Sequence, residues 1–182
     1  MPQSEIHVDE NGNYSSTTNQ AGIIITVSKD FANISGYSNE ELENKNHNIV
    51  RHEDMPKIIF KIMWEQLADG KKFLGFFKNR SKHGEYFWMA TKTYLLRTEA
   101  DGNRTYFSHK SFMSPRAKHH IGSLYEKLLE EEKKGGIEAS EKYLKKYLKF
   151  RGVTFTEYME TFFGGKGLFK VGFFMARKVF SK

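Results

Sequence analysis

Residues 47–56 read His47-Asn48-Ile49-Val50-Arg51-His52-Glu53-Asp54-Met55-Pro56, and an apolar-periodic run from 57 to 67 follows them directly. Two histidines, an arginine, two carboxylates and an asparagine lie within these ten positions. The run that follows predicts a helix, because its apolar residues recur at helical spacing, namely Ile58, Ile59, Ile62, Met63 and Leu67. The sequence therefore predicts a dense polar segment held against a hydrophobic core.

Two interpretations of this polar segment remain open. In the first, it only begins the helix: Asp54 caps it, Pro56 occupies the first turn, and the acidic pair favours the positive end of the helix dipole. That interpretation leaves four side chains without a role, namely His47, Asn48, Arg51 and His52. In the second interpretation, these side chains also bind a ligand.

The remaining periodicity predicts the fold class. Two β-prone runs at 14–18 and 23–28 are separated by turn residues and indicate a hairpin. The second run is apolar on both faces, so we expect a central strand. Short helices are expected at 30–36 and 38–42, and three β-prone segments follow the longer helix, at 72–80, 85–96 and 104–113. This order predicts an α+β fold: a five-stranded antiparallel sheet with helices packed over one face, followed by C-terminal helices.

The chain divides into four parts by composition and periodicity. An N-terminal arm or cap (1–13) precedes the central domain (14–113), a helical extension (114–163) and a basic tail (164–182). The tail has no acidic residue and interleaves phenylalanine with lysine and arginine, which is typical of an amphipathic helix on an anionic membrane surface. Packing of its apolar arc on the domain or on a partner helix is the alternative.

Composition bounds the function. The chain has 182 residues, a formal net charge of +7 and no cysteine, which excludes disulfides, thiolate metal sites and thiol redox chemistry. No signal-peptide pattern or membrane-spanning apolar run is visible, so we expect a cytoplasmic protein, with a possible peripheral contact at the inner membrane face through the tail. We do not expect nucleic acid as a partner, since the basic and aromatic residues of the tail form a helix and no stacking groove. We expect no enzyme either, because no catalytic constellation or metal-ligand spacing is present.

Five motifs resemble those of a known family. They are Asp30-Phe31-Ala32-Asn33-Ile34-Ser35-Gly36-Tyr37-Ser38, the segment 47–56, Met63-Trp64, Lys78-Asn79-Arg80 and Gly84-Glu85-Tyr86-Phe87-Trp88. From about residue 14 to 113 the chain resembles a PAS domain, and within that superfamily the flavin-binding PAS domain of the bacterial aerotaxis (energy taxis) receptors. The Ser-Gly-Tyr-Ser piece is generic to PAS domains, whereas the motif at 47–56 is specific to the aerotaxis branch.

The resemblance implies a cup, formed by the inner face of the sheet and the helices between 29 and 67, that holds FAD non-covalently. The family's flavin-site positions match Arg51, His52, Asp54, Phe60, Trp64 and Asn79. Two residues depart from the family pattern: Ser28 stands where asparagine is frequent, and Phe73 stands where tryptophan is common. A lost amide and a smaller ring would weaken or retune flavin binding.

The chemistry of the side chains supports the same roles. A flavin ring is flat and apolar with a polar edge, so its pocket needs aromatic walls and a few placed amide or cationic groups. We assign the walls to Phe60, Trp64 and Phe73, the edge contact to Asn79, and the positive charge to Arg51 or His52. The ordinary alternative is that Phe60 and Trp64, four residues apart on a helix, are core neighbours.

Three functional hypotheses follow. The first is a redox sensor that passes a change at the flavin to a membrane-bound chemoreceptor or similar signalling protein, with homodimerisation left open. The second is a haem-binding gas sensor in which His47 or His52 is the axial ligand and Trp88 faces the gas, although a tryptophan on an alternating strand is more often a packing residue. The third is a cofactor-free interaction module.

Overall fold

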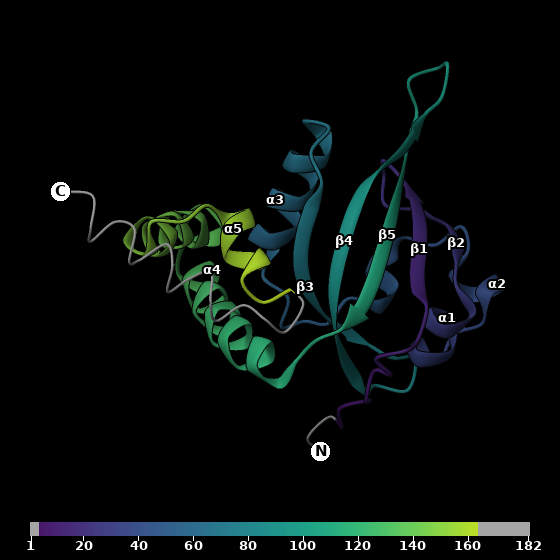
Figure 1. The fold of residues 1–182 in the computed structure, drawn as a ribbon, viewed down its shortest axis with the longest axis horizontal. Helices are drawn as coiled ribbons and strands as arrows, with labels where there is room; N and C mark the ends of the chain where they lie inside the picture. Colours follow the sequence, from purple (N-terminus) through teal and green to yellow (C-terminus); the bar gives the residue numbers. More distant parts are fainter. Residues whose placement is uncertain (1–3, 164–182) are drawn as a thin grey trace.

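The computed structural model describes residues 4–163 and confirms the predicted sheet. Five antiparallel strands lie in the order β2-β1-β5-β4-β3. Their bounds are β1 Tyr14–Asn19, β2 Ile24–Val27, β3 Phe73–Arg80, β4 Tyr86–Thr98 and β5 Arg104–Phe112. The three later strands form one continuous meander, whose long β4–β5 hairpin extends beyond the rest of the sheet in Figure 1.

Strand β2 lies at the edge of the sheet, so the prediction of a central strand was wrong. Ile24 and Val27 are buried, whereas Ile25 is 40% exposed. The outer edge of β2 is covered by the segment that follows the short helices: the amide of Ile24 donates to the carbonyl of Lys45 at 2.8 Å, and the amide of Asn44 donates to the carbonyl of Ile24 at 2.9 Å. These loop contacts satisfy backbone groups at the outer edge of β2, where no further strand pairs with the sheet.

The short helices form where the sequence places their caps. Helix α1 (Lys29–Ser35) is capped by Ser28 and ends at Gly36, which adopts a left-handed φ of 73° that glycine tolerates without strain. Helix α2 (Asn39–Leu42) begins with a capping box between Ser38 and Glu41. A single 3-10 turn, η1 (His47–Val50), then leads into the polar segment.

Helix α3 (Lys57–Ala68) confirms the predicted helix, but its cap comes from elsewhere. Pro56 stands at its N-cap position without a side-chain hydrogen bond, and Asp54 instead pairs with Lys78 of β3 at 2.5 Å. Glu132, far along the chain, accepts hydrogen bonds from the amides of Lys57 and Ile58 at 3.1 and 2.9 Å. The prediction that Asp54 caps this helix was therefore wrong, because tertiary packing brings a closer carboxylate.

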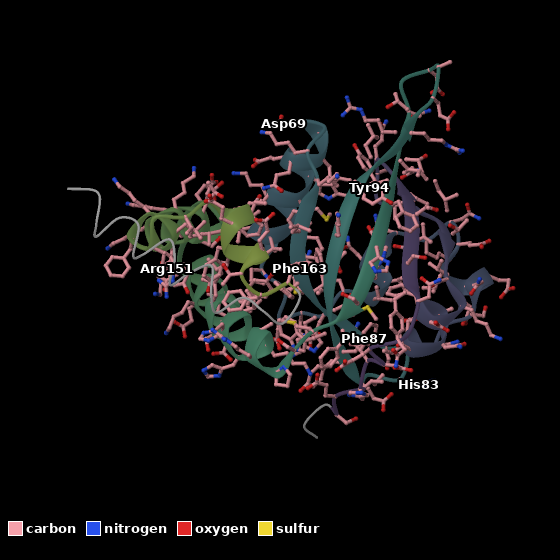
Figure 2. All side chains as sticks on the ribbon, in the orientation of Figure 1. Asp69, His83, Phe87, Tyr94, Arg151 and Phe163 are labelled. Carbon is pink, nitrogen blue, oxygen red and sulfur yellow. The ribbon has the colours of Figure 1, made fainter. Side chains whose placement is uncertain are left out.

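The C-terminal helices pack beside α3 and β3. Helix α4 (Pro115–Arg151) is two helices joined at Gly135 and Gly136, and the φ of 70° at Gly136 explains the glycine. Helix α5 (Phe155–Glu160) follows, and Figure 1 shows both helices on the β3 side of the sheet. Phe163, labelled in Figure 2, lies 4.9 Å from Phe76 between their ring centroids.

Strand alternation gives the sheet two different faces. Along β3 and β4, one set of alternate residues points toward α3 and the other toward α4. Tyr125 of α4 is fully buried, and its hydroxyl donates to the carbonyl of Phe76 at 2.8 Å. Helix α4 therefore covers part of the face opposite to the one that α3 covers.

The described part of the N-terminal arm has a backbone bridge between Glu5 and Tyr86 and a turn at Glu10 and Asn11. The amide of Ile6 donates to the carbonyl of Tyr86 at 2.7 Å, and Val8 is buried against the core. Between residues 4 and 163, the chain has no helix that is both long and apolar enough to cross a bilayer. The predicted amphipathic tail (164–182) lies outside the described residues.

Candidate functional site

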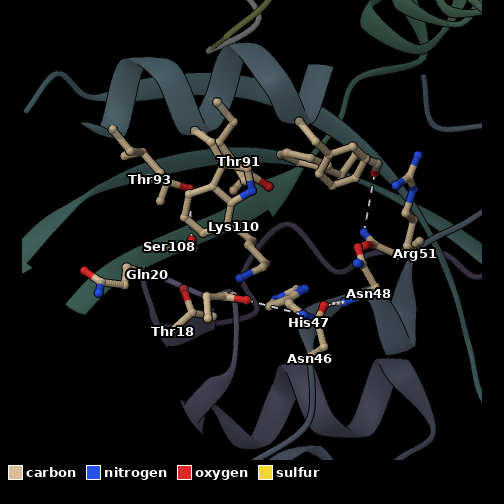
Figure 3. A pocket seen from close by; sticks show the side chains of 18 of the residues that line it. Thr18, Gln20, Asn46, His47, Asn48, Arg51, Thr91, Thr93, Ser108 and Lys110 are labelled. Atoms are coloured by element: carbon tan, nitrogen blue, oxygen red, sulfur yellow. Dashed lines mark hydrogen bonds between the residues drawn. The ribbon is translucent and has the colours of Figure 1, made fainter. Parts of the chain in front are cut away.

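A cavity of about 340 Å³ lies between α3 and the inner face of the sheet, and Figure 3 shows it from close by. Its volume falls in the range of roughly 300–1,000 Å³ that small-molecule sites occupy. It is lined by Thr18, Gln20, Ala21, Gly22, Asn46, His47, Asn48, Arg51, Phe60, Met63, Trp64, Leu67, Phe77, Lys78, Asn79, Thr91, Thr93, Ser108 and Lys110. These residues come from η1, α3 and four strands, so the cavity exists only in the folded domain.

One wall of the cavity is apolar and aromatic. Phe60 and Trp64 lie one turn apart on α3, and Phe77 of β3 faces Phe60 with 5.5 Å between ring centroids. The Trp64 ring meets Tyr106 edge-on at 5.9 Å, which fixes its orientation. Arg51 lies over the Phe60 ring at 4.2 Å. This wall can take the face of a flat, apolar ring.

The opposite wall is polar and is built by neighbouring strands. Thr91 and Thr93 of β4 and Ser108 of β5 point into the cavity, and the hydroxyls of Thr93 and Ser108 are hydrogen-bonded at 2.9 Å. The Thr91 hydroxyl is buried and has no hydrogen-bond partner within the described residues. A buried unpaired hydroxyl is costly, so it marks a place where a ligand atom would be stabilised.

Lys110 of β5 brings a buried amine to the same cavity. Its side chain is 4% exposed, its Nζ donates to Ser16 Oγ at 2.6 Å, and it lies over the Phe31 ring at 4.7 Å. Burial lowers the pKa of Lys110 to about 7. His47 Nε2 is 3.3 Å from the same Ser16 hydroxyl, and burial, with the nearby charge of Lys110, lowers the pKa of His47 to about 3. His47 is therefore neutral at ordinary pH.

The structure brings four of the predicted site residues together at the cavity: Arg51, Phe60, Trp64 and Asn79. Asn79 is 6% exposed, and its backbone is bridged to that of Arg51, which joins the polar segment to β3. The Arg51 guanidinium also donates to the carbonyl of Met55 at 2.8 Å. The polar segment and α3 thus approach the sheet as the resemblance implied.

His52 and Asp54 lie near the cavity but are not part of its lining. His52 is 2% exposed, its Nδ1 accepts from the amide of Asp54 at 3.0 Å, and its ring meets Tyr86 edge-on at 5.9 Å. Burial lowers the pKa of His52. Asp54 pairs with Lys78, whose ammonium lies over the same Tyr86 ring at 4.4 Å. These residues hold the polar segment against β3 and β4.

Phe73 and Trp88 also lie away from the cavity lining. Phe73 is fully buried and stacks on Phe155 of α5 with 6.0 Å between ring centroids. Trp88 points toward α4, where its ring lies 6.0 Å from that of Tyr125. The registers of β3 and β4 place Trp88 on the sheet face opposite to Thr91. In this arrangement Trp88 is a packing residue.

Sequence reasoning did not predict that Lys110 and Thr91 line the cavity. Both belong to strands whose alternation was visible, but nothing local distinguishes an inward lysine from a surface one.

Ser28, which departs from the family pattern, has a structural role. Its hydroxyl accepts hydrogen bonds from the amides of Ser15 and Phe31 at 2.9 and 3.3 Å. Across residues 4–163, no group of three or more histidine or acidic side chains is placed to hold a metal ion.

Comparison with known proteins identifies this part of the chain. The family model described as "PAS fold" matches residues 24–108, which contain most of the cavity lining. Residues 24–108 are a PAS domain. The five-stranded antiparallel sheet, to which β1 outside this range also belongs, superposes on solved structures of similar fold.

Three known proteins are similar to this PAS domain, one in sequence and two in fold. The aerotaxis receptor of Escherichia coli (strain K12) is 42% identical over 74 residues, which are 41% of this chain and 15% of the receptor. A light-oxygen-voltage domain studied with a flavin analogue superposes with a TM-score of 0.53 at 17% identity, over 61% of this chain and 85% of that domain. The dark structure of the blue-light photoreceptor Aureochrome1 LOV superposes with a TM-score of 0.52 at 18% identity, over 60% of this chain and 83% of that chain. The two structures show the shared fold, whereas the receptor is similar in sequence over these 74 residues.

Proposed function

We propose that this protein is a redox sensor whose PAS domain binds FAD non-covalently in the cavity between α3 and the sheet. The observation that carries the proposal is the contrast between the two cavity walls. Phe60 and Trp64 offer aromatic faces on one side, and Thr91, Asn79 and Lys110 offer hydrogen-bonding groups on the other. A flavin ring needs both kinds of wall at once.

The residues present fit such a ring. The buried Thr91 hydroxyl lacks a partner among the described residues, and the Asn79 amide nitrogen makes only a long contact of 3.5 Å with the carbonyl of Phe77. Both groups can bind the polar edge of a ligand without losing a strong existing bond. When bound, FAD supplies a reversible redox centre; the residues of this chain orient it and exclude water. The resemblance of residues 47–56 to the flavin-binding aerotaxis PAS domains supports the same ligand class.

Helix α3 connects the cavity with the C-terminal helices. Phe60 and Trp64 line the cavity from α3, whose first turn is capped by Glu132 of α4. Lys61 of α3 also forms an ion pair with Glu141 of α4. A shift of α3 on flavin reduction would therefore change its contacts with α4 directly.

The proposed output lies in another protein. The aligned relative is a receptor of which this chain matches 15%, and we propose that the PAS domain signals to a membrane-bound chemoreceptor or similar signalling protein in trans. The C-terminal helices are the proposed docking element, and the basic tail (164–182) is the proposed contact with the anionic inner face of the membrane. A homodimer is compatible with this arrangement.

An absorbance spectrum before and after dithionite tests the cofactor. We expect a flavin band at about 450 nm that bleaches on reduction. A Soret band at about 400 nm would replace the proposal with a haem sensor, for which His47 is the cavity-lining candidate ligand. A colourless protein that takes up no FAD after mild refolding would instead favour a cofactor-free interaction module.

Two tryptophan variants test the location of the site. Trp64→Leu removes an aromatic wall, and we expect at least a tenfold loss of FAD affinity by fluorescence titration. Trp88→Leu is the matched control, since Trp88 packs against Tyr125 on the other face of the sheet and should leave the affinity unchanged. Equal losses in both variants would contradict the proposed cavity.

Co-sedimentation with receptor-containing membranes tests the partner. The full chain and a variant ending at residue 163 are mixed with membranes that contain or lack the receptor. We expect the full chain to sediment with receptor membranes, and the shortened chain to bind them more weakly because it lacks the basic tail. No sedimentation of either protein would overturn the trans-signalling part of the proposal and leave the flavin site standing.

A further inference from the structure

The cavity contains an unusual set of charges. The basic residues Arg51, Lys78 and Lys110 line it, but no aspartate or glutamate does, and the side chain of Lys78 points to the other face of the sheet, because Lys78 pairs in register with Trp88. Lys78 has its own counter-charge in Asp54 at 2.5 Å, and the Arg51 guanidinium donates to the carbonyl of Met55. Lys110 is the most deeply buried of the three, and within residues 4–163 it forms no salt bridge.

The groups that face Lys110 supply no negative charge. Ser16 of β1 accepts its hydrogen bond, the Phe31 ring of α1 lies beneath it, and the nearby His47 of η1 is neutral. In the sheet its register partners are Tyr14 of β1, whose pKa is raised by burial, and Thr91 of β4. A lysine enclosed in this way is mostly uncharged above pH 7, and a negative ligand would restore its charge.

We propose that Lys110 holds the negative charge of the reduced ligand, and that its Nζ takes up a proton when the ligand is reduced. This inference rests on the proposed flavin function and assigns one residue to the charge of the reduced form. Lys110 lines the same cavity as the aromatic wall of α3, so its Nζ can approach a ring bound there. Lys110 thus supplies the positive charge that the sequence analysis assigned to Arg51 or His52.

The electrons and protons balance as follows. A two-electron donor, such as a dihydronicotinamide or dithionite, reduces the ligand, which binds one proton and keeps one negative charge. The neutral amine of Lys110 binds a second proton from solvent and becomes the ammonium counter-ion. Reduction therefore takes up two protons for two electrons. A single delocalised charge suits this site better than a phosphate, because burying a multiply charged anion beside one lysine costs more desolvation energy.

The dependence of the midpoint potential on pH counts these protons. A tenfold change in proton concentration shifts a two-electron potential by about 30 mV for each proton taken up. Between pH 8 and 9.5 we expect a slope of about 59 mV per pH unit in the wild type. Lys110→Arg keeps the charge but cannot titrate in this range, so its slope should fall to about 30 mV per pH unit.

Lys92→Arg is the matched control, because Lys92 is exposed on β4 and pairs in register with His109 on the face away from the cavity. Its slope should equal that of the wild type. A wild-type slope of about 30 mV per pH unit, or an unchanged slope in Lys110→Arg, would overturn this inference and leave FAD binding intact. A wild type that binds no FAD would overturn the proposed function and this inference with it.

A second measurement covers the case in which Lys110→Arg fails to fold or to bind FAD. Lysine side chains labelled with ¹⁵N allow Nζ of Lys110 to be titrated by NMR in the FAD-loaded wild type, with the signal assigned by its absence in Lys110→Met. We expect the pKa of Lys110 to rise by at least about 3 units between the oxidised and the reduced protein, so that Lys110 stays protonated in the reduced protein up to pH 9.5. The same pKa in both states would overturn the inference.

Discussion

Removal of the Glu132 carboxylate tests whether the C-terminal helices stabilise the wall of the cavity. Glu132 accepts from the amides of Lys57 and Ile58 at 3.1 and 2.9 Å, and from Ser140 Oγ at 3.2 Å. No side chain of the N-cap residue itself caps α3. Glu132→Ala therefore leaves two amides of the first turn without their carboxylate partner.

The magnitude follows from these bonds. Loss of an N-terminal cap costs about 0.5–2 kcal/mol, and loss of a negative charge at a helix N-terminus costs about 0.3–1 kcal/mol. The two effects overlap, so we expect Glu132→Ala to lower the free energy of unfolding by about 1–2 kcal/mol. Glu132→Gln keeps one acceptor and should cost about half as much. For a chain of this size the melting temperature should fall by about 2–8 °C in Glu132→Ala.

Urea unfolding followed by far-UV circular dichroism measures the change, and the slope of the transition should stay constant. Glu131→Ala is the control. Among residues 4–163 the Glu131 carboxylate pairs with Lys134 across one helical turn, at 2.6 Å, and such pairs contribute about 0.2–0.5 kcal/mol. The reasoning is refuted if Glu132→Ala is no more destabilising than Glu131→Ala. The docking of α4 would then contribute nothing to the start of α3.

Three further outcomes are expected. Thr91→Val removes the unpaired hydroxyl at nearly constant volume; in the ligand-free protein it should leave stability unchanged or raise it, while FAD affinity falls about tenfold, as calorimetry and fluorescence titration would measure. The folded pKa of Lys110, about 7, lies below its ordinary value of 10.5, so between these values the unfolded chain binds the extra proton and stability should rise with pH. Urea titrations should show this as a gain of about 2 kcal/mol from pH 7.5 to 9 that Lys110→Met abolishes. Tyr125→Phe leaves the carbonyl of Phe76 without its 2.8 Å hydrogen bond and should cost about 1–2 kcal/mol, with no loss of FAD affinity.

The sequence by itself determined the local elements of this protein. Strand alternation, turn glycines and caps such as Ser38 with Glu41 act over a few residues, so β1, α2 and α3 were predicted close to their observed bounds. The Gly135-Gly136 pair likewise marked the break within α4. Helix α5 was not predicted as a separate element, although the capping box of Thr154 and Glu157 was a signal for it.

Tertiary structure alone decided which polar groups meet. A strand has two faces, and a shift of one residue in register exchanges them, so only the assembled sheet places Lys110 and Thr91 inside and Trp88 against α4. The cap of α3 came from Glu132, 74 residues beyond Ile58, a contact that no local pattern contains. Residue type and spacing are local properties of a chain, whereas burial, and the charge state that follows from it, depend on every segment that packs around a side chain.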